Sequence, residues 1–201
     1  MNRLALAFFL LAPVPTVLAA QDATAPTGVY VTDPAHTSLT WKISHFGLSH
    51  YTARFTGIEA RLAWNAEEPE SSVLKVSIDP MSVKTDFPFP DVEDFDSKIG
   101  SGADFLAAKP IAFETRSITV TGEGQATVTG DLTFRGETHP ASLDVHFNGS
   151  VAEHPMDKQP RLGFSATGVV HRTDWGLGFS VPALGEDVDI LIEAEFVPPK
   201  P

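Results

Sequence analysis

Apolar and polar residues alternate along most of this chain, and the alternation restricts the folds that it can adopt. In "SLTWKISHF" the apolar residues Leu39, Trp41 and Ile43 share one side of an extended strand, because successive side chains in a strand point to opposite faces. The same pattern recurs in seven further segments, namely 56–64, 74–78, 110–120, 128–134, 143–147, 162–170 and 188–196. A helix needs a repeat near 3.6 residues, so the pattern predicts eight strands, each with one buried and one wetted face.

The connections between these segments are short and carry turn signals, such as "TGEG" at 121–124 and "FRGE" at 134–137, which favour antiparallel neighbours. Eight antiparallel strands fit either a closed up-and-down barrel or a two-sheet sandwich. The barrel is favoured because closure removes exposed strand edges. The 201 residues suffice for one domain with a substantial core. The predicted fold class is therefore all-β, an eight-stranded antiparallel barrel.

One long interruption separates the third and fourth predicted strands. Its sequence, "DFPFPDVEDFDSKIGSGADF" at 86–105, contains two prolines, six acidic residues and four phenylalanines, Phe87, Phe89, Phe95 and Phe105. Acidic residues near a helix start, together with the helix formers of "ADFLAA", predict a short helix within 91–108. If this insertion folds across one barrel end, its rings face the interior and its carboxylates face water, which predicts a lid. The alternative is that the four rings merely plug a filled barrel.

The interior of an eight-stranded barrel is either filled by side chains or able to hold one small ligand. On the predicted inward faces, large rings are mixed with small residues that thin the filling on one side, namely Gly130, Ala166, Gly168 and Ala194. This composition permits a cavity without requiring one, since an apolar face is usually just core. The pattern alone leaves a ligand cavity and a packed core equally open.

The first 19 residues have the pattern of a cleavable export signal. Arg3 precedes an apolar run at 4–12, and Val17 and Ala19 stand where signal peptidase reads small or aliphatic residues. The run is far shorter than the roughly 20 residues that cross a bilayer, so an uncleaved anchor is the lesser alternative. We expect an export signal at 1–19, a linker at 20–30 and one β-barrel domain at 31–198.

Charge and composition exclude several functions. Cleavage after Ala19 removes one of the 14 Lys and Arg residues and none of the 26 Asp and Glu residues, which takes the net charge from −12 to −13. Nucleic acids and anionic lipid surfaces are therefore poor partners. The sequence has no cysteine, so the fold depends on no disulfide and no lipid is attached through a cysteine.

The sequence contains no complete set of catalytic or metal-binding residues. His45 and His50 have ligand-like spacing but lack an HExxH pair or a cysteine partner, so no metal site is expected. Ser72 and Lys75 match Ser-x-x-Lys, but an offset of three places them on opposite faces of a strand. No catalytic residue is therefore assigned.

The segment "HRTDWGLGF" at 171–179 predicts a bulge or a barrel corner with two glycines. Arg172 and Asp174 are two residues apart, so in an extended chain they share a face and could form an ion pair beside Trp175. The alternative role for this segment is contact between a ligand and Trp175 or Phe179.

Five local motifs resemble, in the same order along the chain, the YceI-like family of polyisoprenoid-binding proteins. They are "DPAHTSLTWKISHFGLSHYTARF", "SSVLKVSIDPMSVKTD", "GADFLAAKPIAFETRSI", "VTGDLTFRGETHPASLDV" and "FSATGVVHRTDWGLG". The matching positions include Asp33, His36, His45, Gly47, Ser82, Val83, Thr85, Asp104, Phe105, Pro110, Phe113, Gly130, Leu132, Thr133, Gly136, Arg172, Asp174 and Gly176. The resemblance spans about Val31 to Val197, and it implies an extended lipocalin-like barrel that encloses an isoprenoid chain in the bacterial periplasm. The chain departs from the family at 88–105, where many members carry an Arg-Asp-containing segment.

These observations together predict an exported, periplasmic carrier that binds one long isoprenoid chain, either a polyisoprenoid or an isoprenoid quinone, without catalysis. No cofactor besides this lipid is expected, and transient contact with a membrane or membrane protein and a homodimer are left open. One alternative is an enzyme that acts on a quinone-like or lipid substrate with His45 as its acid or base. The other alternative is a stress-response interaction module with a filled barrel.

The predicted ligand contacts form four groups. The wall residues are Trp41, Ile43, Phe55, Leu62, Phe113, Phe134, Val145 and Phe164. The lid residues are Phe87, Phe89, Phe95 and Phe105. The corner segment contributes Trp175 and Phe179. His36 and His45 are interpreted as residues that make structural hydrogen bonds at a strand end, or alternatively as the polar residues of the mouth that contact a ligand headgroup.

Overall fold

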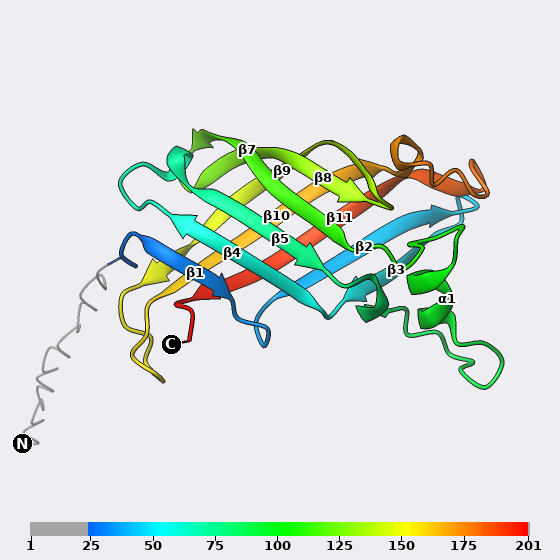
Figure 1. Ribbon diagram of the computed structural model, residues 1–201, viewed down its shortest axis with the longest axis horizontal. Helices are drawn as coiled ribbons and strands as arrows, with labels where there is room; N and C mark the ends of the chain where they lie inside the picture. The colour runs from blue at the N-terminus through cyan, green and yellow to red at the C-terminus, as the bar shows by residue number, and fades with distance from the viewer. Residues whose placement is uncertain (1–23, 201) are drawn as a thin grey trace, which may run out of the picture.

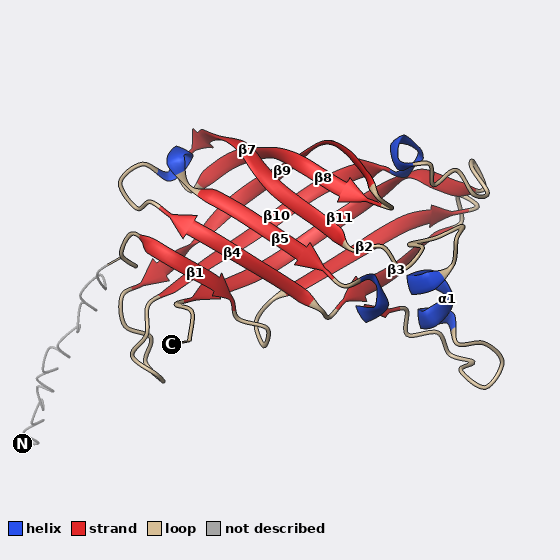
Figure 2. Cartoon of the chain, in the orientation of Figure 1, coloured by secondary structure: helices blue, strands red, loops and turns tan. Residues whose placement is uncertain are grey.

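The computed structural model describes residues 24–200, so the predicted export signal at 1–19 lies outside the described residues. Within them the chain forms eleven strands, one α-helix and three 3₁₀ helices (Figures 1 and 2). The strands are β1 (Gly28–Thr32), β2 (Ser38–His45), β3 (Ser49–Phe55), β4 (Ile58–Trp64), β5 (Val73–Ile78), β6 (Val83–Lys84), β7 (Ile111–Gly122), β8 (Gln125–Phe134), β9 (Glu137–Val151), β10 (Arg161–His171) and β11 (Leu184–Val197). The helices are η1 (Pro69–Ser71), η2 (Pro80–Ser82), α1 (Phe95–Ser101) and η3 (Arg172–Trp175). No helix within 24–200 is long and apolar enough to cross a membrane.

Eight of these strands close into an antiparallel barrel, which confirms the predicted fold class. Each pairs with the next in the order β1, β4, β5, β7, β8, β9, β10 and β11, and β11 returns to β1. The closing contact joins Val31 to Val197 and Thr32 to Phe196. Short turns connect β7, β8 and β9, as their turn signals predict. The barrel runs lengthwise across the view in Figure 1, with α1 at one end.

Three walls of the barrel are each split into two strands, which the sequence pattern does not predict. β11 pairs with β2 through residues 184–193 and with β1 through 196–197, so β1 and β2 lie in line along it. β3 and β4 return beside β2 and β1, and β6 and β5 lie beside β3 and β4. At one break, a Cβ atom on Gly57 would lie 2.9 Å from the Ser82 Cβ atom, so the approach needs glycine. β1, β3 and β6 are additions to the eight predicted strands, and β1 begins inside the expected linker at 20–30.

The acidic insertion forms α1 between β6 and β7, within the predicted helical range 91–108. Asp94 caps the helix by accepting a 3.0 Å hydrogen bond from the Ser97 backbone N–H. Asp96 ties the helix to the end of β6, because it accepts 2.8 Å and 2.6 Å hydrogen bonds from the backbone N–H and the hydroxyl of Thr85. Burial acts to raise the pKa of Asp96, but these bonds and Lys84 together lower it.

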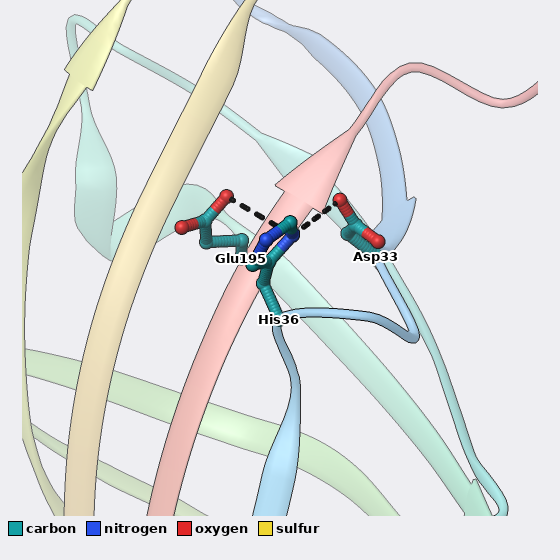
Figure 3. Close-up of side chains that lie close together, drawn as sticks. All are labelled: Asp33, His36 and Glu195. Carbon is teal, nitrogen blue, oxygen red and sulfur yellow. Dashed lines mark hydrogen bonds and ion pairs between the residues drawn. The ribbon is translucent and has the colours of Figure 1, made fainter.

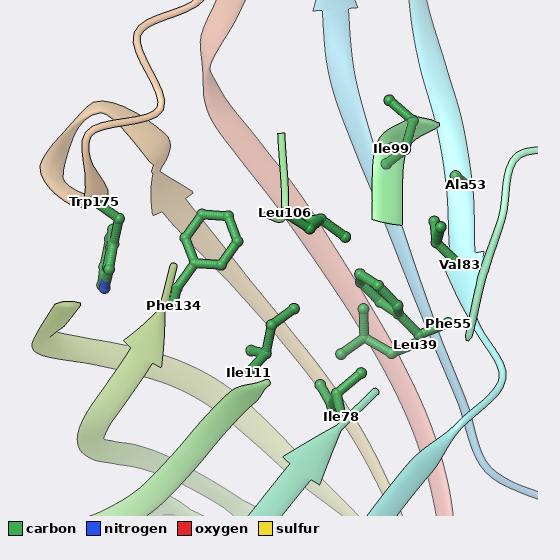
Figure 4. Packing of buried hydrophobic residues seen from close by; sticks show 10 residues of the cluster. All are labelled: Leu39, Ala53, Phe55, Ile78, Val83, Ile99, Leu106, Ile111, Phe134 and Trp175. Carbon is green, nitrogen blue, oxygen red and sulfur yellow. The ribbon is translucent and has the colours of Figure 1, made fainter. Parts of the chain in front are cut away.

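Buried apolar side chains form two clusters, one toward each end of the barrel. The cluster at the α1 end packs Ile99 of the helix and Leu106 against the wall residues Phe55, Ile111 and Phe134 (Figure 4). The cluster at the other end consists of Ala25, Tyr30, Ala60, Leu62, Leu162 and Phe196. The helix therefore covers one end of the barrel and contributes to its core, while the space between the clusters is bounded by the strands.

Candidate ligand-binding cavity

The barrel encloses a cavity of about 960 Å³. Its lining extends from Ala25 and Phe147 at one end to Phe87 and Leu177 at the α1 end, and all eight barrel strands contribute to it. Most of the lining side chains are apolar. The volume lies near the upper limit of the roughly 300–1,000 Å³ that is typical of small-molecule pockets. The interior is therefore hollow enough for a large apolar ligand.

The eight predicted wall residues all line this cavity. They are Trp41, Ile43, Phe55, Leu62, Phe113, Phe134, Val145 and Phe164. Each lies in a strand, where alternation fixes the face to which a side chain points, so the sequence pattern was sufficient to place them. At the end opposite α1, the rings of Trp64, Phe147 and Phe164 pack against one another, with centroids 5.2–5.9 Å apart. This end of the cavity thus contains a cluster of three aromatic rings.

Three of the four aromatic rings predicted to form the lid line the cavity. Phe87, Phe95 and Phe105 line the cavity from the insertion. Phe89 does not, because 61% of it is exposed and its ring packs edge-on against Phe87, with centroids 5.7 Å apart. The reason is that Phe89 lies in the loop between β6 and α1, where no strand alternation fixes its direction.

The corner segment also differs from its prediction. Phe179 lines the cavity, but Trp175 is 3% exposed and belongs to the packed core beside Phe134. The indole N–H of Trp175 donates a 3.1 Å hydrogen bond to the Leu132 carbonyl, which fixes the ring in the core. We therefore assign Trp175 to the support of the corner and Phe179 to the cavity.

Arg172 does not form the predicted ion pair with Asp174. Its guanidinium donates to the backbone carbonyls of four residues, Leu177, Phe179, Leu184 and Gly185, at 2.6–3.1 Å. Arg172 is 3% exposed whereas Asp174 is exposed, because the chain turns as η3 here instead of continuing as a strand. The buried cation thus closes the loop between η3 and β11.

The two histidines predicted at the mouth lie in different surroundings. His45, at the end of β2, lines the cavity, and its ring packs edge-on against Phe46 with centroids 4.7 Å apart. His36 lies outside the cavity in the loop between β1 and β2, with 60% of its side chain exposed. The loop after β1 turns the His36 side chain to the outer surface, where it makes a hydrogen bond at the end of a strand instead of lining the mouth.

His36 belongs to a polar cluster on this outer surface (Figure 3). Its Nδ1 atom lies 3.0 Å from Asp33 Oδ2 and 3.9 Å from Glu195 Oε2. The hydrogen bond between the two side chains raises the pKa of His36 and lowers that of Asp33. These three residues could offer ligand atoms to a metal ion, but Arg161 donates a 3.0 Å hydrogen bond to Asp33, and its charge opposes a cation. We interpret the cluster as a clamp that joins the loop to β10 and β11.

Residues 30–196 match the YceI-like domain family. The chain belongs to the YceI-like family. A UPF0312 protein of Pseudomonas fluorescens is 35% identical over 168 residues, which cover 82% of this chain and 83% of the relative. BcnA of Burkholderia cenocepacia has a TM-score of 0.69 at 16% identity, covering 82% of this chain and 98% of that one. A polyisoprenoid binding domain from Saccharophagus degradans has a TM-score of 0.56 at 13% identity, covering 86% and 99% of the two chains. At these identities the two structures show a shared fold.

Two of the four small interior residues of this YceI-like barrel, Gly130 and Gly168, do not line its cavity. A Cβ atom on Gly130 would lie 2.4 Å from the Phe113 ring, and one on Gly168 would lie 2.7 Å from a methyl group of Leu143. Both glycines are therefore covered by side chains of neighbouring strands. The expectation that these two glycines thin the filling is wrong, whereas Ala166 and Ala194 do line the cavity.

Several lining residues of this YceI-like barrel were missed by sequence reasoning. Tyr51, Ile99, Leu106 and Leu177 line the cavity from β3, the insertion and the corner segment. Tyr51 had a usable signal, since Tyr51, Ala53 and Phe55 alternate with polar residues. Burial raises the pKa of the Tyr51 phenol, which donates a 3.2 Å hydrogen bond to the Thr85 carbonyl. The other three lie outside the strands, where the pattern has no period-two signal.

Proposed function

We propose that this protein is an exported periplasmic carrier that holds one long isoprenoid chain, a polyisoprenoid or an isoprenoid quinone, in its barrel. The observation that carries the proposal is the cavity of about 960 Å³, which extends along the barrel and is lined almost wholly by apolar and aromatic side chains. The shared fold with a polyisoprenoid binding domain supports it. The signal-like N-terminal sequence supports export.

The energetics of such a ligand suit a carrier. Burial from water is worth roughly 0.8 kcal/mol per CH₂ group, so the five carbons of one isoprene unit contribute about 4 kcal/mol before ordering costs. A bilayer offers the chain nearly the same gain. The preference for the protein over a membrane is therefore small, which allows both uptake and release.

The polar end of the ligand is proposed to lie at the α1 end of the cavity. Charged or titratable lining residues gather there, namely His45, Lys98, Asp104 and Arg172. A prenyl chain would then point toward Trp64, Phe147 and Phe164 at the other end. A few polar groups of this kind orient a ligand while apolar contacts provide most of the affinity.

Binding without catalysis is the activity that we propose. The alternative enzyme would depend on His45, whose ring packs against the exposed Phe46 at the mouth. A His45→Gln variant separates the two functions, because a carrier keeps its lipid and an enzyme loses turnover of a quinone-like substrate.

The test is native mass spectrometry of the protein purified from its export compartment, followed by solvent extraction and identification of the bound molecule. Ala166 lines the middle of the cavity, flanked by Val145 and Ile192 on the neighbouring strands, so Ala166→Trp should block the chain. Thr167→Trp is the control, because its side chain is exposed on the same strand. We expect lipid in the wild type and the control and none, or a shorter chain, in Ala166→Trp. Empty wild-type protein that also refuses added prenyl lipid would contradict the proposal.

A further inference from the structure

Exposed apolar side chains gather on three loops at the α1 end of the barrel. These loops are the turn between β2 and β3, the loop between β6 and α1, and the loop between η3 and β11, which lie at the same end in Figure 1. Their exposed apolar residues are Phe46, Leu48, Phe89, Val92, Phe179 and Val181, which we call the apolar rim. Leu48 and Val92 are 87% and 81% exposed, so they have almost no contact with the rest of the chain.

Two contacts tie parts of these loops together at the α1 end of the barrel. The Phe46 backbone N–H donates a 2.6 Å hydrogen bond to the Ala183 carbonyl, which joins the turn after β2 to the loop before β11. The rings of Phe105 and Phe179 pack edge-on, with centroids 5.7 Å apart, which joins the insertion to that same loop. The rim therefore gathers six exposed apolar side chains at one end of the barrel.

A continuous series of rings leads from this rim into the cavity. Phe89 packs against Phe87, Phe87 against Phe95, and Phe95 against Tyr51, with centroids 5.7, 5.1 and 6.0 Å apart. Tyr51 in turn lies 6.2 Å from Trp41. Phe89 is on the surface, whereas the other four rings line the cavity. A prenyl chain that follows these rings need not cross open water, which would oppose its transfer.

We propose that the apolar rim docks onto a zwitterionic lipid bilayer, and that the ring series from Phe89 to Trp41 is the path by which a lipid enters the cavity. The second part rests on the proposed function, and the docking does not. Among the rim loops, Asp91 is exposed, while Asp86 pairs with Arg54 at 2.7 Å and Glu93 pairs with Lys98 at 2.6 Å. The exposed Asp91 complements the ammonium groups of zwitterionic headgroups, and the net charge of −12 repels anionic lipids.

The test is co-flotation of the full mature protein with vesicles of phosphatidylcholine and phosphatidylethanolamine, and with matched vesicles that contain phosphatidylglycerol. The rim variant is Leu48→Asp combined with Val92→Asp. The control is Met156→Asp, because Met156 is also 87% exposed but lies between β9 and β10 at the opposite end of the barrel. We expect the rim variant to bind neutral vesicles at least about tenfold more weakly than the wild type and the control, and phosphatidylglycerol to weaken wild-type binding.

Three outcomes would overturn the docking proposal: a wild type that binds no neutral vesicle, a rim variant that binds as well as Met156→Asp, or binding that increases with phosphatidylglycerol. Loss of self-association in the rim variant, with no vesicle binding by the wild type, would assign the rim to a second copy of the chain. Mass spectrometry of the same samples separates this proposal from the carrier function. Retained isoprenoid without vesicle binding rejects only the docking, and vesicle binding by lipid-free protein that accepts no prenyl lipid rejects only the carrier.

Discussion

Replacing Arg172 with methionine should lower the free energy of unfolding by about 3–5 kcal/mol. The side chain is 3% exposed, and its guanidinium donates four hydrogen bonds to backbone carbonyls at 177–185. Burial lowers the pKa of Arg172, but an arginine stays protonated at neutral pH, so these bonds keep their charge. Methionine keeps most of the apolar stem and removes every donor. The variant therefore isolates the hydrogen bonds that close the loop before β11.

The magnitude follows from the number of bonds and from the surroundings of the loop. A hydrogen bond to a charged group contributes roughly 1.5–3 kcal/mol, so four such bonds sum to about 6–12 kcal/mol if they are independent. Bonds that share one side chain are not independent. The Phe179 carbonyl belongs to an exposed residue and the other three acceptors to half-buried residues, so part of the loss is regained as bonds to water when the loop loosens. We therefore expect the loss in the free energy of unfolding to be less than this sum, at about 3–5 kcal/mol. This loss is a large fraction of the roughly 5–15 kcal/mol that stabilises a typical domain.

Urea unfolding followed by tryptophan fluorescence measures this change. Arg116→Met is the matched control, because the Arg116 side chain is 57% exposed and pairs with Asp131 on the outer surface. An exposed pair of this kind contributes about 0–1 kcal/mol. If Arg172→Met loses no more stability than Arg116→Met, the inference that Arg172 closes the corner is wrong.

Three further predictions concern the cavity, the helix and the outer clamp. Phe164→Glu should abolish lipid co-purification, since an ionised carboxylate in an apolar cavity is costly, whereas Glu123→Lys in an exposed turn should not; retained lipid in a folded Phe164→Glu protein would refute the cavity assignment. Asp96→Ala should reduce the free energy of urea unfolding by about 1–3 kcal/mol, because it leaves a buried donor at the helix anchor unpaired, and an unchanged midpoint would exclude this anchor. The hydrogen bond to Asp33 raises the pKa of His36. The loss of stability in His36→Gln should therefore be largest below the ordinary histidine pKa of 6.5 and should vanish as pH rises through the raised pKa. A difference in stability that does not change with pH would contradict this prediction.

The barrel was predictable because its long strands bury one face and wet the other. Alternation over segments such as 162–170 and 188–196 survives as β10 and β11, and the wall residues follow from strand direction alone. β1 was missed because it has only five residues, too few for a clear alternation. β3 was predictable, because Tyr51, Ala53 and Phe55 alternate with polar residues, but the alternation was overlooked.

The errors in the site fall where no regular backbone fixes the side chains. Three predicted contact residues do not line the cavity, namely His36, Phe89 and Trp175. The first two lie in loops, and Trp175 lies in the 3₁₀ helix η3. The existence of the cavity was equally out of reach, because Gly130 is covered by the ring of Phe113 from the next strand. Residue size along one strand does not determine whether neighbouring strands fill the space.

The seam between β6 and β7 is the place where the barrel wall can open at the lowest cost in free energy. β7 pairs with β5 up to Ile111 and Ile78, and within residues 24–200 no further ladder joins β7 to β6. The insertion closes this seam with side chains such as Ile99 and Leu106. By contrast, β10 and β11 are joined by ten consecutive residue pairs. An opening elsewhere breaks backbone hydrogen bonds, whereas an opening at the seam separates mainly side chains, and local openings use the least stable part of a fold. Ligand exchange is therefore expected through the insertion, which also carries Phe89 of the apolar rim.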